Sequence, residues 1–214
     1  FNKHPDIKPR DYQIDAAYKI LKYRRCLAEL ATSAGKTLIS FMVIAYLMEK
    51  LSKRKILFIV PNVQLVLQAT GDFEQYNYKS RVQLKVQQIY AGVKIRKSSN
   101  IVIGTYQSLV KKDADYFEQF DVVMVDETHK AKAASIQKIT DKCWHCDYRF
   151  GLSGTIPKRG TVDRLTLMSA MGPLVTQVKA AQLQEEGYIS NCKVIQLQME
   201  YATDEQKDAF WQLS

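Results

Sequence analysis

Ala31-Thr32-Ser33-Ala34-Gly35-Lys36-Thr37 is the segment with the clearest bearing on the architecture of this chain. It joins a short apolar run, Cys26–Leu30, to a long apolar helix predicted from about Lys36 to Glu49. A loop between a strand and a helix offers backbone N–H groups and the positive helix end to phosphate oxygens. Lys36 is placed to reach the β- and γ-phosphates of a nucleotide, and the Thr37 hydroxyl to ligate Mg²⁺. An ordinary capped helix start is the alternative, because Leu30 occupies the first glycine position of G-x-x-x-x-G-K-[ST].

A second polar cluster directly follows an apolar run, where Val122–Val125 continue into Asp126-Glu127-Thr128-His129. Two adjacent carboxylates at the end of a buried strand are costly unless they meet a cation or take part in proton transfer. The earlier segment makes both tasks available: Asp126 would hold the Mg²⁺ shell, and Glu127 would polarise the attacking water. We therefore predict nucleotide hydrolysis, with solvated charges at a strand end as the alternative.

Apolar runs of strand length alternate with segments of helical period along most of the chain. The predicted strands are Cys26–Leu30, Ile56–Val60, Val82–Val86, Ile101–Ile103, Val122–Val125 and Tyr148–Leu152. The predicted helices are Asp15–Lys22, Lys36–Glu49 and Val63–Phe73. Continuous apolar strands separated by helices indicate an α/β fold, a parallel sheet with helices on both faces. The functional loops of such sheets lie beyond the carboxyl ends of the strands, where both polar clusters fall.

The composition is typical of a folded domain. Of 214 residues, 46% are hydrophobic and 25% charged, with 9 Gly and 5 Pro, which excludes a disordered or collagen-like chain. The longest apolar stretch, Leu38–Met48, is too short for a membrane span, and no secretory signal is visible. The net charge of +9 favours a polyanion partner, although it can also mark only a solvated surface.

Four cysteines are too few to form a stabilising disulfide framework in a chain of this length. Cys26 and Cys192 lie beside apolar segments and are predicted to be small buried side chains. Cys143 and Cys146 form a C-x-x-C around His145, but no second ligand pair for a structural zinc occurs in the sequence. A reduced packing role is therefore favoured over a metal or redox site.

Asp126-Glu127-Thr128-His129 resembles the D-E-x-H box of superfamily 2 helicases and translocases. Other segments also resemble motifs of that family and occur along the chain in the same order as in the family. They are Arg10-Asp11-Tyr12-Gln13, Ala31–Thr37, Val60-Pro61-Asn62 with Leu65 and Gln68, Gly104–Leu109, Leu152–Thr155, Gly172-Pro173 and Glu186–Ile189. Ser33 stands where most members carry Gly. The resemblance runs from about Lys8 to Leu197 and is greatest to the branch of phage branch-migration helicases, type I and III restriction motors and XPB-like repair helicases. It implies a RecA-like P-loop NTPase domain that uses ATP and Mg²⁺ and acts on DNA, with RNA not excluded.

The resemblance also implies a role for each matched residue. The nucleotide-binding residues would be Arg10, Gln13, Thr32, Ser33, Ala34, Gly35, Lys36 and Thr37. Gln13 would read the adenine edge, or would simply be a polar residue at a helix start. Lys36, Asp126 and Glu127 would be catalytic, and Thr37 and Asp126 would bind Mg²⁺. The residues coupling the ATP site to nucleic acid would be His129, Ser153 and Thr155. Those contacting the sugar-phosphate backbone would be Pro61, Asn62, Gln68, Gly104, Thr105 and Gln107.

The expected boundaries combine this resemblance with the residue pattern after Gly187. Residues 1–190 would form the first RecA-like domain, and residues 191–214 a strand from Val194 and a helix from Thr203 leading to a second RecA-like domain. Family members carry that second domain with its arginine fingers, and none follows Ser214, so the chain alone is expected to be nearly inactive in turnover. A start at Phe1 suggests numbering from inside a longer protein, and the resemblance suggests a bacterial or phage-infected cytoplasm.

Three functional hypotheses remain. The first is an ATP-driven DNA helicase or branch-migrating translocase. The second, the motor of a restriction complex that moves duplex DNA without separating it, shares every motif. The third is a non-catalytic nucleic-acid-binding module, against which the intact Lys36 and Glu127 argue. A small GTPase or kinase is excluded, because the sequence has no N-K-x-D segment and no catalytic loop for a substrate hydroxyl.

Overall fold

The computed structural model describes residues 7–50, 55–77, 84–90, 99–128 and 133–190. Within these ranges, seven strands form one sheet in the order β3-β4-β2-β5-β6-β1-β7, and each pair of neighbours is parallel. The strands are β1 (Arg25–Leu30), β2 (Ile56–Val60), β3 (Val86–Ile89), β4 (Ile101–Thr105), β5 (Val122–Val125), β6 (Tyr148–Ser153) and β7 (Leu174–Val178). The helices are α1 (Asp11–Leu21), α2 (Lys36–Lys50), α3 (Val63–Tyr76), α4 (Tyr106–Leu109), α5 (Ala114–Phe117), α6 (Ala133–Lys142), α7 (Val162–Met171) and α8 (Ala180–Glu185). The predicted α/β class is confirmed.

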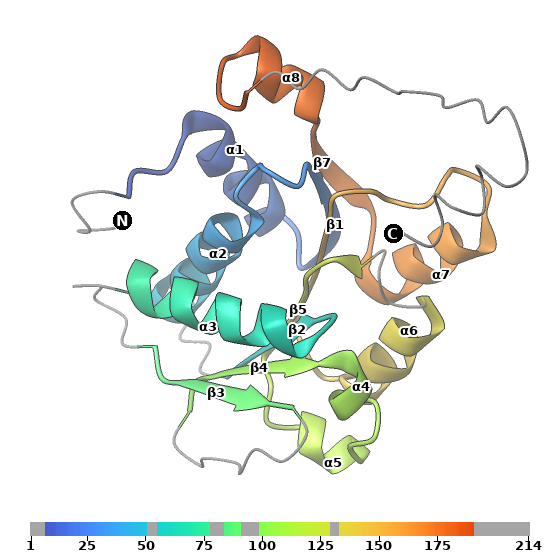
Figure 1. Cartoon of the computed structure of the whole chain (residues 1–214). Coiled ribbons are helices and arrows are strands. Elements are labelled where there is room, and N and C mark those ends of the chain that lie inside the picture. The colour runs from blue at the N-terminus through green and yellow to red at the C-terminus, as the bar shows by residue number, and fades with distance from the viewer. Residues whose placement is uncertain (1–6, 51–54, 78–83, 91–98, 129–132, 191–214) are drawn as a thin grey trace, which may run out of the picture.

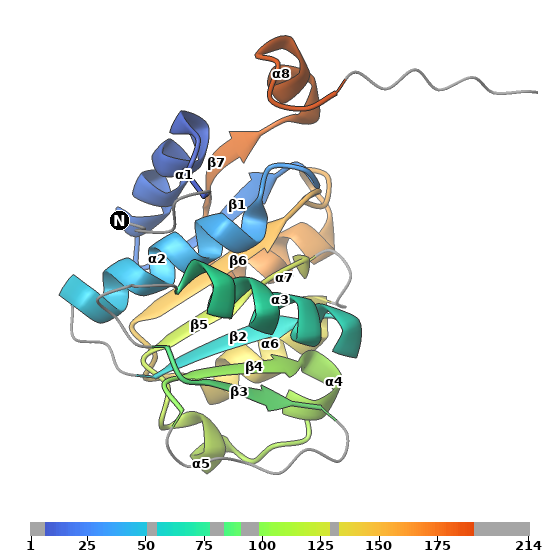
Figure 2. The same cartoon turned by 60° about the vertical axis from the view of Figure 1, so that its left-hand side comes forward.

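Helices cover both faces of the sheet, with α1, α2 and α3 on one face and α6 and α7 on the other (Figures 1 and 2). Successive residues of a strand point to opposite faces, so the inner strands supply two separate hydrophobic cores. On β2, Phe58 and Val60 belong to the first core, whereas Leu57 and Ile59 belong to the second. Strands β2, β4 and β5 are buried along their whole length, which is why they are continuous apolar runs.

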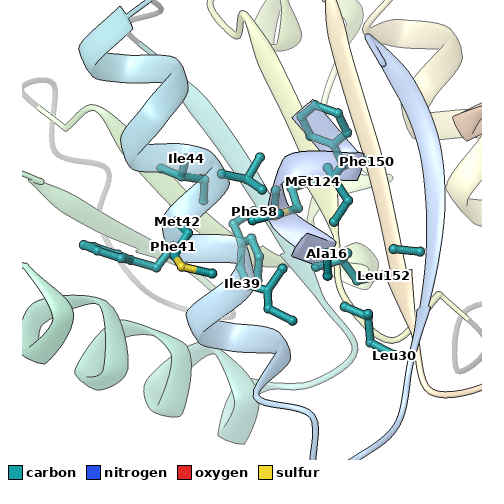
Figure 3. Packing of buried hydrophobic residues seen from close by; sticks show 14 of the residues in the cluster. Ala16, Leu30, Ile39, Phe41, Met42, Ile44, Phe58, Met124, Phe150 and Leu152 are labelled. Atoms are coloured by element: carbon teal, nitrogen blue, oxygen red, sulfur yellow. The ribbon is translucent and has the colours of Figure 1, made fainter. Parts of the chain in front are cut away.

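Helix α2 contributes Ile39, Phe41 and Ile44 to the first core (Figure 3). The Phe41 ring packs edge-on against two rings of α3, with centroid distances of 6.0 Å to Phe73 and 5.5 Å to Tyr76. These contacts join α2 to α3 and leave most of α2 without a solvent-exposed face. The start of α2 is therefore held firmly against the sheet, at the point where the chain emerges from the loop after β1.

Strand β3 spans Val86–Ile89, whereas the predicted strand is Val82–Val86, of which residues 82 and 83 lie outside the described residues. The buried positions of β3 are Gln87 and Ile89, and Ser99 Oγ donates a hydrogen bond to Gln87 Oε1 at 3.0 Å. A buried glutamine with a hydrogen-bonding side-chain partner leaves no apolar signature in the sequence, so the apolar alternation does not extend beyond Val86.

Helices α4 to α8 and strand β7 have no counterpart in the sequence prediction. Helix α1 begins at Asp11, earlier than the predicted Asp15, because the Gln13 side chain accepts a hydrogen bond from the Arg10 N–H at 2.9 Å and caps the helix. The strand predicted from Val194 and the helix predicted from Thr203 lie outside the described residues. Among the helices that are described, none has the length and apolar character needed to cross a membrane.

Candidate nucleotide-binding site

Three polar segments meet at the carboxyl ends of neighbouring strands. Strand β6 lies between β1 and β5, so the segments after Leu30, Val125 and Leu152 leave the sheet side by side. A first side-chain carbon added at Gly154 would lie 3.5 Å from Thr32 Oγ1, in ordinary van der Waals contact. The loop after β1 and the loop after β6 are thus immediate neighbours, as expected for a site at this edge of a parallel sheet.

Helix α1 braces the loop after β1. Tyr12 Oη and Gln13 Nε2 both donate hydrogen bonds to Ala34 O, at 3.2 and 3.0 Å. Gly35 has a φ of 73°, in the left-handed region that favours glycine, and a side chain there would clash with Gln13 Nε2. The glycine therefore allows both the turn into α2 and the close approach of α1.

The residues predicted to recognise adenine lie beside this loop, but their polar groups are engaged within the protein. Gln13 is 6% exposed, and its amide joins the Arg10 N–H to Ala34 O. The Arg10 guanidinium donates a hydrogen bond to Tyr188 O at 2.9 Å and lies 5.2 Å from the centroid of the Tyr188 ring. Arg10 thereby ties the start of α1 to the segment that follows α8.

The predicted phosphate-binding lysine and the predicted base form an ion pair. Lys36 Nζ lies 3.0 Å from Glu127 Oε1, and the two side chains are 7% and 12% exposed. Separating a largely buried pair leaves a charge without compensation, so the pair fixes the start of α2 against the end of β5. The structure therefore brings together the two residues on which the predicted chemistry depends.

The backbone turns sharply after β5. The Asp126 N–H donates to Ile59 O at 2.8 Å and extends the pairing with β2, and the Glu127 N–H then donates to Asp126 Oδ1 at 2.9 Å. Glu127 has a φ of 53°, and in the described part of the chain it is the one residue other than glycine with a positive φ. This conformation costs about 1–3 kcal/mol and is found preferentially at functional sites.

The segment after β6 has its own hydrogen bonds. Ser153 Oγ donates to Thr155 O at 2.6 Å and accepts from the Thr155 N–H at 3.4 Å. Glu29 Oε1 on β1 accepts a hydrogen bond from the Ile156 N–H at 3.4 Å, a contact between segments far apart in the sequence. His129 lies outside the described residues, so its link to Ser153 and Thr155 stays a prediction.

The two predicted Mg²⁺ ligands offer oxygen donors of the kind this ion prefers. Mg²⁺ is usually held by one or two carboxylates together with substrate phosphates and waters, and the Asp126 carboxylate and Thr37 hydroxyl fit that set. Burial raises the pKa of Asp72 on α3, and the neighbouring Thr37 side chain acts in the opposite direction. Asp72 belongs to none of the motifs.

No group of three or more His, Cys, Asp or Glu side chains that could hold a metal ion occurs in the ranges that the structure describes. Cys26, Cys143 and Cys146 are buried free thiols, and Cys146 Sγ donates a hydrogen bond to Phe120 O at 2.9 Å. Burial raises the pKa of Cys26 to about 12. The predicted burial of Cys26 is confirmed, and Cys192 lies outside the described residues.

The residues predicted to contact nucleic acid divide into exposed and buried ones. Asn62, Gln68 and Gln107 are exposed and follow β2 and β4, which are neighbours in the sheet. Asn62 Oδ1 also caps α3 by accepting a hydrogen bond from the Leu65 N–H at 2.9 Å. The buried residues are Pro61, Gly104 and Thr105. Their places in the fold fit local roles in shaping the strand ends and, for Thr105, capping α4.

The family described as type III restriction enzyme, res subunit, matches residues 6–158. The chain belongs to this family. It is 33% identical over 199 residues to the ATP-dependent DNA helicase uvsW of Enterobacteria phage T4, a match covering 91% of this chain and 39% of the relative. It is 25% identical over 201 residues to the DNA 3'-5' translocase XPB2 of Sulfurisphaera tokodaii, covering 94% of this chain and 42% of the relative.

A solved structure is similar to this member of the res-subunit family. The crystal structure of the UvsW helicase from bacteriophage T4 has a TM-score of 0.71 and 33% sequence identity, over 79% of this chain and 60% of that chain. The resemblance to superfamily 2 helicases is therefore confirmed, and the domain is the first, RecA-like domain of that superfamily. The chain spans less than half the length of the two curated relatives, 39% and 42%.

Proposed function

We propose that this chain is the ATP-binding motor domain of a DNA helicase or translocase, in which ATP hydrolysis drives movement along nucleic acid or its unwinding. The observation that carries the proposal is the ion pair between Lys36 and Glu127, the predicted phosphate-binding lysine and the predicted general base. The relatives named as a DNA helicase and a DNA translocase support the same class of activity.

The chemistry follows from an exchange of partners at Lys36. When ATP occupies the loop of residues 32–37, the Lys36 ammonium turns from Glu127 to the β- and γ-phosphates. Glu127 then orients a water molecule toward the γ-phosphorus and accepts its proton. Thr37 and Asp126 would hold Mg²⁺, which would supply positive charge to neutralise the phosphate oxygens.

Recognition of adenine by Gln13 belongs to the same proposal. The Gln13 amide already ties the N-terminus of α1 to the phosphate loop through Ala34 O. To pair with the N6 and N7 edge of adenine, the amide gives up one of these hydrogen bonds. Binding of the base is in this way linked to the position of the loop, and Arg10 keeps the start of α1 in place through Tyr188.

DNA is the proposed partner, with RNA as the second option. Exposed Asn62, Gln68 and Gln107 would contact the sugar-phosphate backbone, and His129 would relay the state of the nucleotide through Ser153 and Thr155. A second RecA-like domain of the same longer protein would close the site and supply arginine fingers, so the 214-residue chain alone would turn over slowly. The phage relative supports action in a bacterial or phage-infected cytoplasm.

The description of the matched family supports a second candidate, the motor of a restriction complex. Such a motor moves along duplex DNA without separating its strands. The longer protein that contains this domain would decide between the two. Unwinding of a forked duplex favours the helicase, whereas displacement of a third strand from an intact duplex without unwinding favours the restriction motor.

Nucleotide binding by the 214-residue chain tests the proposal directly. Calorimetry with ADP and Mg²⁺ is expected to give binding that Lys36→Ala weakens by about 10- to 100-fold, the loss of a charge-assisted hydrogen bond. Lys50→Ala, at the exposed end of the same helix, serves as the control and is expected to bind like the wild type. Equal affinities for wild type and Lys36→Ala would reject the phosphate role of Lys36.

A further inference from the structure

A groove runs between helix α7 and the outer edge of strand β7 (Figure 1). Its volume is about 340 Å³. One wall is formed by residues 173–177, and the other by Arg159, Arg164 and Met168. Successive side chains of a strand point to opposite faces of the sheet, so a groove that touches consecutive residues of β7 follows the edge of that strand.

The outer edge of β7 offers backbone hydrogen-bonding groups. In the part of the chain that the structure describes, β7 ends the sheet and pairs with β1 alone. On the paired side, Val178 O accepts a hydrogen bond from the Ala31 N–H at 2.9 Å. Backbone groups of successive residues point to opposite edges of a strand, so the N–H and C=O of Gln177 point away from β1. Such an edge is a template on which another extended chain can form hydrogen bonds.

The charged side chains that line the groove are both arginines. Arg159 is exposed, and Arg164 is partly buried. The Arg164 guanidinium donates a hydrogen bond to Pro157 O at 3.0 Å, which holds it beside the loop after β6. A guanidinium has five N–H donors, so this bond leaves the group able to bind a carboxylate as well. The groove is therefore complementary to an acidic partner.

Apolar side chains extend the groove along α7. Leu165 is 64% exposed and lies three residues before Met168, on the same side of the helix. Val162, one turn before Leu165, is 77% exposed. Large apolar side chains exposed together are typical of a surface that binds another protein. They also favour a peptide over the phosphate backbone of a nucleic acid, which has no apolar side chains to place on them.

We propose that this groove binds an extended, acidic peptide segment of a partner protein, which adds to the sheet as a strand beside β7. In this mode of binding, main-chain hydrogen bonds supply affinity and side-chain contacts supply selectivity. Arg159 and Arg164 select glutamate or aspartate, and Leu165 and Met168 contact an apolar residue. Strands β1, β6 and β5 separate β7 from β2 and β4, so this surface is distinct from the proposed nucleic-acid contacts and goes beyond the proposed function.

The test measures binding of a fluorescein-labelled peptide with the repeat Glu-Thr-Val-Thr to the 214-residue chain by fluorescence anisotropy. This repeat places glutamate and valine alternately on one face of an extended strand. Arg159→Glu is expected to weaken binding by about tenfold and to improve binding of a matched Lys-Thr-Val-Thr peptide. Lys138→Glu makes the same change of charge at an exposed position of α6, and as the control it is expected to match the wild type.

Amide hydrogen exchange, followed by NMR, tests whether the peptide is added as a strand. The Gln177 N–H is expected to exchange more slowly when the peptide is bound, because it gains a hydrogen-bond acceptor. The proposal is overturned if the wild-type chain does not bind the peptide, if Arg159→Glu binds it equally well, or if exchange at Gln177 is unchanged.

Two further measurements identify other occupants. A labelled oligothymidylate that binds the wild type more tightly than the peptide, and loses affinity in Arg159→Glu, would assign the groove to nucleic acid. Dimerisation of the wild-type chain in sedimentation that Arg159→Glu abolishes would assign it to a second copy. Either result overturns the proposal, and neither depends on whether the chain binds nucleotide.

Discussion

Lys36 and Glu127 form an ion pair with 3.0 Å between Lys36 Nζ and Glu127 Oε1, and in the proposed mechanism each takes another partner during hydrolysis. A phosphate that binds Lys36 would have to displace the Glu127 carboxylate from it. The affinity for nucleotide would therefore be reduced by the cost of breaking the pair, and Glu127 would act as a base only after the phosphate has bound. At the scale of single residues, this exchange would link binding to activation of the base.

Glu127→Gln in the isolated chain tests that exchange. The variant is expected to lose about 2 kcal/mol of unfolding free energy without nucleotide, because Lys36 loses its charged partner. It is also expected to bind ADP more tightly in EDTA, because Lys36 no longer has to leave a carboxylate. Urea unfolding and calorimetry measure the two effects, with Glu185→Gln on exposed α8 as the control. Weaker ADP binding by Glu127→Gln would contradict the exchange.

In a protein that includes the second RecA-like domain, substitutions of the two adjacent carboxylates are expected to have different effects on ATP binding and hydrolysis. Glu127→Gln should abolish single-turnover hydrolysis while ATP remains bound, because the amide cannot take the proton of water. Asp126→Asn should weaken mainly the Mg²⁺-dependent part of ATP binding, because a neutral amide is a poorer partner for the ion. Affinities with and without Mg²⁺, together with hydrolysis in the presence of DNA, separate the two. Identical behaviour of both variants would mean that the carboxylates only end the strand.

At the scale of elements, α3 joins two parts of the proposed mechanism. Its cap is Asn62, a residue predicted to touch nucleic acid, and its later turns pack Phe73 and Tyr76 against Phe41 of α2. One helix therefore reaches from the proposed nucleic-acid contact to the helix that begins at Lys36. The effect of a substitution in α3 therefore has to be measured both on the stability of the domain and on its affinity for nucleic acid.

Asn62→Asp separates those two effects. The aspartate keeps the capping oxygen for the Leu65 N–H, so the free energy of unfolding is expected to stay near that of the wild type. Its negative charge is expected to weaken DNA binding through repulsion of phosphates. Asn62→Ala is expected to lose about 1 kcal/mol of stability through the missing cap. Thermal unfolding and fluorescence anisotropy with labelled DNA provide the readouts; full DNA affinity in Asn62→Asp would remove Asn62 from the interface.

Sequence patterns locate the inner strands because those strands are buried on both faces and leave an unbroken apolar run. The same patterns do not locate β3 and β7, where Gln87 and Thr176 occupy buried positions and break the pattern. For the site, motifs identify Lys36 and Glu127 but not their mutual ion pair. The sequence gives no indication of the role of Glu29, because that role comes from a partner on a distant segment rather than from its neighbours in the chain.

At the scale of the whole molecule, both proposed sites lie at one edge of the sheet. The nucleotide residues follow β1 and β5, and the exposed Asn62 and Gln107 follow β2 and β4. Strand β2 lies between β4 and β5, so the two sites are adjacent. A net charge of +9 adds attraction for a polyanion that does not depend on base sequence.

DNA binding by the 214-residue chain is therefore expected to be weak, indifferent to sequence and steeply dependent on salt. Release of counterions predicts a linear fall of log affinity with log salt concentration. Anisotropy titrations between about 50 and 200 mM salt measure the slope, with two DNA strands of different sequence compared at each concentration. An affinity that does not change over this range would contradict backbone recognition.

The hydrogen bond between Glu29 and the Ile156 N–H has a mechanical consequence. Glu29 is the residue before the last residue of β1, and the chain passes from there straight into the phosphate loop. The other Glu29 oxygen accepts a hydrogen bond from Gln177 on β7, so one carboxylate fastens three segments. A displacement of the backbone after β6 would be transmitted through Glu29 to the start of the phosphate loop. In the proposed motor, force on the nucleic-acid side would then strain the residues that hold the nucleotide.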